Sequence, residues 1–186
     1  QWSRALQPFA SPYQFNPLGL NPLRAVVERH VDLKAIAAGS LQVFVTATSV
    51  RTGQAEVFQG DRLCVDAFLA SACLPHLFRA VEIDGVPYWD GGYTGNPALW
   101  PLVYDTAAQD VLLVKINPIE RLGTPDTPME IADRVSEITF NAGLTGELRA
   151  IAFVQRLLRE ERLEPAQYKD LRLHMVHDEE SLAPLG

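Results

Sequence analysis

Two runs that consist almost entirely of apolar and β-branched residues constrain the fold of this chain more than any other feature. They occupy residues 41–48 and 111–116. Such runs are typical of strands that are covered on both faces, as in a parallel sheet. Helical patterns alternate with them along the chain. The sequence therefore predicts an α/β fold with a mostly parallel central sheet flanked by helices.

The helical segments are recognised by their apolar spacing and by the residues at their ends. In the longest, Thr127 precedes Pro128, and Glu130 follows at the third position, which is a capping box. Gly143 and Gly146 weaken its middle and predict a kink. Its predicted apolar seam consists of Ile131, Val135, Ile138, Leu144, Leu148, Ile151, Val154 and Leu158. Shorter helices are predicted at residues 22–31, 33–37, 63–73 and 97–103.

A hairpin is predicted where two short strands flank Asp84-Gly85, a strong two-residue turn signal. Pro87 lies in its second strand and predicts an edge position, because proline cannot donate a hydrogen bond to a neighbouring strand. The hairpin leads directly into Asp90. Further strands are predicted at residues 55–58 and 171–176.

Length and composition indicate one globular domain over residues 1–186. Hydrophobic residues make up 47% of the chain, and no apolar run approaches the roughly 20 residues of a membrane helix. The net charge of -7 argues against a nucleic-acid partner, which selects for basic surfaces. It does not argue against peripheral contact with a membrane through a local apolar rim.

The densest local signal for chemistry is Asp90-Gly91-Gly92. Two glycines after an acid permit a backbone path that other residues resist, and strand ends are where sites gather in open α/β sheets. A carboxylate there fits a base, a metal ligand or an orienting group. The competing interpretation is a plain tight turn, as for Asp84. A glycosidase-like pair of carboxylates is disfavoured, because Asp84 is explained by its turn.

The segment before the hairpin carries a resemblance to a known family. Residues 68–78 contain Ala70-Ser71, Pro75 and Phe78, which resemble the Ala-Ser-x-x-x-Pro-x-x-Phe helix end of bacterial patatin-like phospholipases. The hairpin, the Asp-Gly-Gly and the following Gly-Asn-Pro occur in the same order in that family. The similarity extends roughly from Asn16 to Leu158 and implies a patatin-like fold.

The resemblance implies a serine–aspartate dyad in which Asp90 is the base, acting on lipid esters without cofactor or metal. The family's serine lies in Gly-x-Ser-x-Gly, and a glycine-rich loop supplies its oxyanion hole. None of the seven serines in this chain has that spacing. We therefore expect a fold that is incomplete at its N-terminal side and inactive alone, with the serine and oxyanion hole supplied by an N-terminal segment or a companion chain.

Two further expectations concern function and place. The alternative to an enzyme is a non-catalytic lipid-binding or scaffold module of the same fold, which the missing serine motivates. The expected location is cytoplasmic or peripheral to a membrane, in a bacterium. The two cysteines suit a reducing compartment.

The remaining candidates have plain structural interpretations. Ser71 is read as a small residue that permits close packing, His76 as structural, and the cysteines as buried thiols. The aromatic residues near Asp90 suit core packing or an acyl pocket. The histidines near the C-terminus lack a third ligand in place, which disfavours a zinc site. These residues are Cys64, Cys73, Trp89, Tyr93, Trp100, His174 and His177, with Asp178, Glu179 and Glu180 beside the last histidine.

Overall fold

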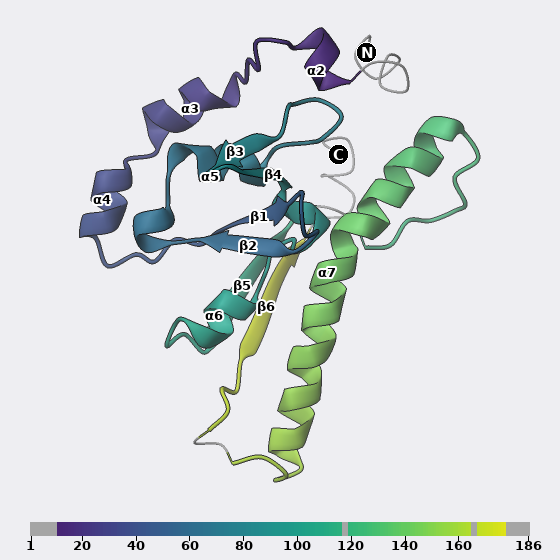
Figure 1. The fold of residues 1–186 in the computed structure, drawn as a ribbon. Coiled ribbons are helices and arrows are strands. Elements are labelled where there is room, and N and C mark those ends of the chain that lie inside the picture. Colours follow the sequence, from purple (N-terminus) through teal and green to yellow (C-terminus); the bar gives the residue numbers. More distant parts are fainter. Residues whose placement is uncertain (1–10, 117–118, 165–166, 178–186) are drawn as a thin grey trace. The chain divides into compact units, whose positions relative to one another are not determined.

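A computed structural model describes residues 11–116, 119–164 and 167–177 of the chain. The chain divides into two compact units, Gln1–Thr94 and Gly95–Gly186. Each is described by itself below, and the single domain over residues 1–186 stays a prediction. Both units combine helices with strands, as the α/β prediction requires (Figure 1).

The first unit contains an antiparallel sheet of four strands with the order β2-β1-β4-β3. Its strands are β1 Val45–Ser49, β2 Ala55–Phe58, β3 Val81–Ile83 and β4 Val86–Asp90. The prediction of a mostly parallel sheet is wrong here. Short turns join β1 to β2 and β3 to β4, and such turns connect only antiparallel neighbours. The apolar run that predicted β1 carries no information about strand direction.

The helices of the first unit come before the first strand, between β2 and β3, and after β4 along the chain. They are α2 Pro12–Phe15, α3 Leu23–His30, α4 Leu33–Ala38, α5 Val65–Ser71 and the 3-10 turns η1 Gly60–Arg62 and η2 Gly91–Tyr93. The predicted helix of residues 63–73 is confirmed as α5, and it packs against β1, β3 and β4. Between them lies a buried core that includes Ala47, Phe58, Ala67 and Tyr88. The Phe58 and Tyr88 rings meet edge to face, with centroids 5.3 Å apart.

The hairpin is confirmed, but its second strand is not at an edge. β4 pairs with β3 on one side and with β1 on the other. Pro87 is tolerated because the ladder with β1 ends at the pair Ser49–Tyr88. The Pro87 carbonyl accepts from Val50 N–H, so the proline nitrogen faces the point where β1 has already ended.

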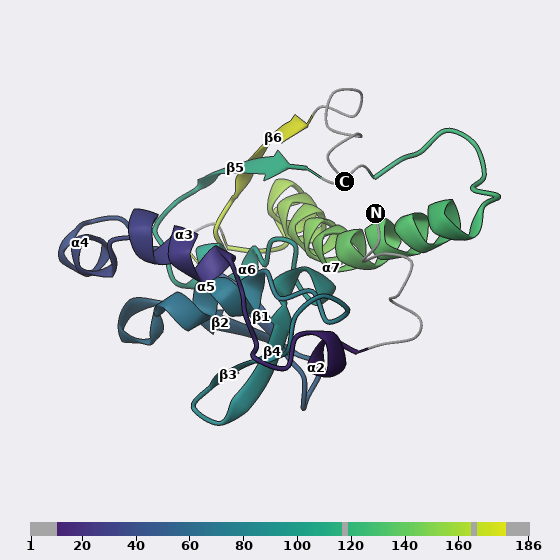
Figure 2. The same cartoon turned by 90° about the horizontal axis from the view of Figure 1, so that it is seen from above.

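The second unit holds the one parallel pair among the described strands. β5 Asp110–Lys115 pairs in parallel with β6 Arg172–His177, beside α6 Trp100–Tyr104 and the long helix α7 Pro128–Arg159. The capping box of α7 is confirmed by its hydrogen bonds. The helix is unbroken through both glycines, and its axis bends part-way along, as a kink in its middle predicts (Figure 1, Figure 2). The hydrophobic core of the second unit consists of Leu99, Val111, Leu113, Leu144 and Leu171.

Two apolar faces of the second unit are exposed where the sequence predicted burial. In β5 exposed and buried residues alternate, and Leu112 and Val114 are exposed by 62% and 66%. In α7 the single predicted seam is wrong. At about 100° per residue, Ile131 lies some 140° around the helix from buried Leu144. Ile131, Val135 and Ile138 are accordingly exposed.

The helix predicted to open at Asn96-Pro97 begins later, at Trp100. Its first N–H groups are capped from a distance, because the Glu147 carboxylate of α7 accepts from Leu99 N–H and Trp100 N–H. In the part of the chain that the structure describes, no helix has the length and apolar character needed to cross a membrane.

Candidate active site

Asp90 occupies the last position of β4 and the N-cap of η2. Its Oδ1 accepts from Gly92 N–H at 2.7 Å. Its backbone N–H donates to the Cys73 carbonyl at 2.9 Å, which ties the strand end to the segment after α5. The carboxylate is therefore held at a strand end by its own turn, as the sequence predicted for this position.

A pair of hydroxyl groups holds the Asp90 backbone from the other side. Thr48 of β1 is buried, and its Oγ1 donates to the Asp90 carbonyl at 2.7 Å. The Thr48 and Thr94 hydroxyl oxygens lie 2.9 Å apart. Sequence reasoning missed both threonines, because the pairing of β1 with β4, which sets Thr48 opposite Trp89, is not visible in the sequence. Their contacts fix where the carboxylate stands.

Gly91 is required by a close approach of two backbones. A Cβ at this position would lie 2.1 Å from the Thr46 carbonyl oxygen of β1. That distance is far inside van der Waals contact, so a side chain would push the turn away from the sheet. The first glycine after Asp90 therefore serves packing.

Burial shapes the ionisation around Asp90. Desolvation raises the pKa of Asp90, and the hydrogen bond from Gly92 N–H lowers it by less. Burial, opposed by a backbone hydrogen bond, raises the pKa of Cys73 to about 11, with a smaller contribution from the Asp90 charge. Burial and the Asp90 charge likewise raise the pKa of Tyr93.

The other serine and histidine candidates stand apart from this arrangement. The Ser71 hydroxyl donates to the Phe68 carbonyl at 2.8 Å, a bond within its own helix. His76 is exposed in the segment after α5. His174 Nε2 lies 3.1 Å from Asp110 Oδ1, beside the bidentate Arg172–Asp110 pair.

No metal or thiol site emerges from the described residues. They contain no group of three or more His, Cys, Asp or Glu side chains that could hold a metal ion. The His177 side chain and residues 178–180 lie outside the described part. Cys64 and Cys73 are free thiols, half-buried and buried. Trp89 and Tyr93 are half-buried next to Asp90 in the chain, whereas Trp100 belongs to the second unit.

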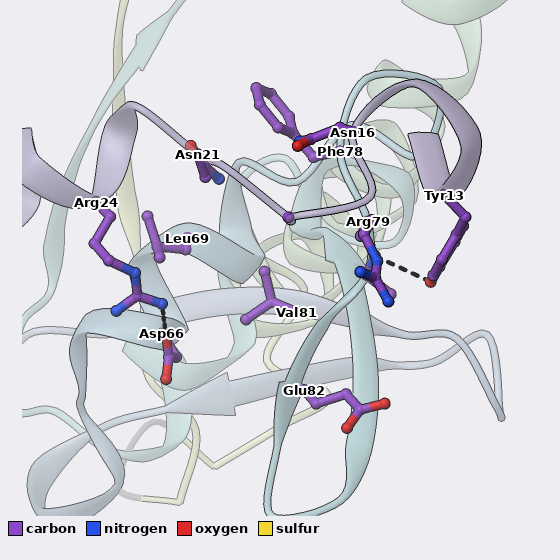
Figure 3. Close-up of a pocket in the computed structure, with 12 residues that line it drawn as sticks. Tyr13, Asn16, Asn21, Arg24, Asp66, Leu69, Phe78, Arg79, Val81 and Glu82 are labelled. Carbon is purple, nitrogen blue, oxygen red and sulfur yellow. Dashed lines mark hydrogen bonds and ion pairs between the residues drawn. The ribbon is translucent and has the colours of Figure 1, made fainter. Parts of the chain in front are cut away.

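A pocket of about 380 Å³ lies elsewhere in the first unit, and Asp90 is not among its lining residues (Figure 3). Both of its arginines have partners. Arg24 pairs with Asp66, and Arg79 stacks over the Tyr13 ring while donating to the Pro17 carbonyl. These contacts attach the segment around α2 and α3 to α5 and β3. The pocket is thus accounted for as packing between helices and sheet.

Comparison with known families agrees with this geometry. The model of the patatin-like phospholipase family matches residues 4–103, which is more than half of the chain and includes Asp90 and its supporting threonines. A comparison with curated proteins finds no match. The extent of the family match establishes that this chain belongs to the patatin-like phospholipase family.

Proposed function

We propose that this chain supplies the general base, Asp90, of a lipid acyl hydrolase that uses a serine–aspartate dyad. Members of the family are esterases and phospholipases. The nucleophilic serine and the oxyanion hole come from a segment outside these 186 residues, because none of the serines here lies in Gly-x-Ser-x-Gly. The chain alone is therefore inactive, and lipid esters are the substrate class.

The observation that carries the proposal is the way Asp90 is held. A serine hydroxyl becomes a good nucleophile when a positioned base accepts its proton. Backbone and hydroxyl contacts fix Asp90 from β1 and from the Cys73 segment. Partial burial raises its pKa, which makes the carboxylate a stronger base.

With Oδ1 held by Gly92 N–H, we assign the proton transfer to Oδ2. The serine Oγ attacks the ester carbonyl carbon as its proton passes to Asp90. The tetrahedral intermediate collapses to an acyl-serine, and the departing alkoxide takes the proton from Asp90. Water then attacks the acyl-serine and gives its proton to Asp90, which returns it to the serine Oγ as the fatty acid leaves.

The outer face of β5 and β6 supports the second half of the proposal. Leu112, Val114 and Val176 are exposed on it, although strands of parallel sheets are ordinarily covered on both faces. A further segment packed on this face would complete the second core. We assign the proposed serine-bearing segment to this face.

The decisive experiment expresses the gene together with its coding sequence upstream of Gln1 and measures ester hydrolysis by the product. Asp90→Asn should reduce kcat by at least roughly a hundredfold while leaving a fluorophosphonate-reactive serine in place. Asp84→Asn is the matched control, because Asp84 also precedes a glycine but lies in the hairpin turn, and it should retain activity. Full activity of Asp90→Asn would refute the assignment.

The second candidate function is a lipid-binding or scaffold module that has lost catalysis. The absent Gly-x-Ser-x-Gly motivates it. A translation start near Gln1 favours this function, whereas an upstream Gly-x-Ser-x-Gly in the same reading frame favours the hydrolase. Sequencing the gene upstream of Gln1 separates the two.

A further inference from the structure

Helix α7 carries two apolar faces, and the fold uses one of them. Leu144 is buried in the second core with Leu148 and Ile151 against it. The opposite face contains five apolar residues that are all exposed. At 100° per residue they fall within an arc of about 60°. They are Ile131, Val135, Ile138, Ala142 and Phe153.

This exposed face is long and its members are strongly solvated. Val135, Ile138 and Phe153 are exposed by 57%, 55% and 52%. From Ile131 to Phe153 the face extends about 33 Å at 1.5 Å per residue. A Cβ built at Gly146, beside this face, would meet no atom within 4 Å, so no other described part of the second unit covers the middle of the helix there.

The charges of α7 are segregated with respect to this face. Its acidic residues Glu130, Asp133, Glu137 and Glu147 all project from the buried half of the helix, at least about 80° from the apolar arc. The charged residues within the arc are Arg149 and Arg156. Arg156 lies over the Phe153 ring at 5.4 Å and pairs with Glu160 beyond the helix end.

We propose that the exposed face of α7 docks on the surface of a membrane that contains anionic phospholipid. The choice of a lipid surface rests on the proposed function, and the face itself rests on the geometry of α7. In a protein of net charge -7, the helical residues of this face combine apolar side chains with Arg149 and Arg156, and the one carboxylate that follows them, Glu160 at the C-cap, pairs with Arg156. An interfacial helix buries its apolar side chains below the headgroups while arginines meet the lipid phosphates.

A second copy of the chain fits this face less well. In an antiparallel pair centred on Ala142, each Arg149 would face Val135 of the other helix. In a parallel pair each Arg149 would face its own counterpart. Both arrangements place an arginine in the interface with no carboxylate from the apolar arc to pair it, which is unfavourable. Lipid phosphates offer Arg149 the partner that the helical residues of this face lack.

The test measures sedimentation with vesicles of the protein as its gene encodes it, with any segment upstream of Gln1 included. Vesicles of equimolar phosphatidylcholine and phosphatidylglycerol should bind the chain, and those of phosphatidylcholine alone should bind it more weakly. Val135→Asp with Ile138→Asp should lower the partition coefficient by roughly tenfold or more. Arg149→Gln should weaken binding to the anionic vesicles and reduce its dependence on salt.

Val26→Asp is the matched control, because Val26 lies on α3 with a similar exposure of 53%. It should bind like the wild type, and circular dichroism should show that every variant keeps its helix content. Absence of binding to both vesicle types, or equal loss with Val26→Asp, would overturn the proposal.

Light scattering measures the molar mass of the protein and tests whether the exposed face of α7 forms a dimer instead. A dimer that Val135→Asp and Ile138→Asp dissociate, with vesicle binding unchanged, would assign the face to a second copy and also overturn the proposal. The measurement needs no catalysis. Asp90→Asn should bind vesicles like the wild type, so failure of the dyad and failure of the docking face are read separately.

Discussion

Strand β1 of the first unit and strand β5 of the second differ in burial, and the difference is the reverse of what their residue types suggest. β1 contains two threonines and a serine, yet four of its five residues are buried. β5 has four consecutive apolar residues, yet burial alternates along it and three of its six residues are exposed. β1 has strands on both sides and α5 against it, whereas β5 has β6 as its described partner. Burial is thus decided by how many elements surround a strand.

The surroundings of the two strands differ in the same way. Around Asp90, buried hydroxyls and a glycine contact form a rigid support. Around β5 and α7, apolar faces remain on the surface. Asp90 therefore lies in the unit with the more fully buried strand, and the exposed apolar faces of β5 and α7 belong to the other unit.

The largest expected effect comes from the two cores themselves. Phe58→Ala removes a fully buried ring and should lower the free energy of unfolding by about 3–5 kcal/mol. Leu112→Ala on the outer face of β5 should cost no more than about 1 kcal/mol. Urea denaturation of both variants measures the contrast. Equal losses would show that the outer face of β5 is covered in solution.

Two glycines sharpen the comparison. Gly91→Ala forces a Cβ against the Thr46 carbonyl and should destabilise the chain by about 1–3 kcal/mol. Gly146→Ala places its methyl group in open space within a helix and should stabilise it by about 0.5–1 kcal/mol. Opposite shifts of the thermal midpoint check both statements, and a neutral Gly91→Ala would contradict the close contact at Asp90.

The hydroxyl support of Asp90 has a smaller expected effect. Thr48→Val keeps the shape of the side chain but leaves the Asp90 carbonyl without its donor, which should cost about 1–2 kcal/mol. Thr48→Ser retains the hydroxyl and should lose less. Denaturation measures stability, and the carboxyl chemical shift of Asp90 reports whether its position changes. If Thr48→Val leaves both unchanged, the hydroxyl pair does not position Asp90.

The smallest effect is a difference in pH dependence between two carboxylates. The raised pKa of Asp90 means that its contribution is most favourable below the ordinary aspartate pKa and is lost as pH rises through the folded value. The hydrogen bonds from Arg172 and His174 lower the pKa of exposed Asp110, so its contribution is present above the ordinary pKa and is lost as pH falls.

Comparing the wild type with Asp90→Asn and with Asp110→Asn across acidic pH measures these contributions. The advantage of the wild type over Asp90→Asn should grow as pH falls toward the ordinary aspartate pKa. Its advantage over Asp110→Asn should shrink in the same direction. Parallel trends for the two variants would contradict the assigned environments.

Local sequence signals predicted most of the elements. The turn Asp84-Gly85 and the capping box at Thr127 were predicted correctly, because both depend on neighbours within a few residues. The strand direction in the first unit and the edge position of Pro87 were predicted wrongly, because both depend on which strands pair. The threonine support of Asp90 was missed for the same reason, since Thr48 and Thr94 lie 46 residues apart.

The sequence by itself determined that Asp90 ends a strand and is followed by two glycines, because turn chemistry and strand patterning are local. The family of the chain also follows from sequence. Tertiary structure alone decided what holds the carboxylate and which apolar residues stay exposed. The hydrogen bond from Thr48 and the burial of one face of α7 both arise from contacts between segments that are distant in the sequence. The identity of an apolar residue does not specify which segment will cover it.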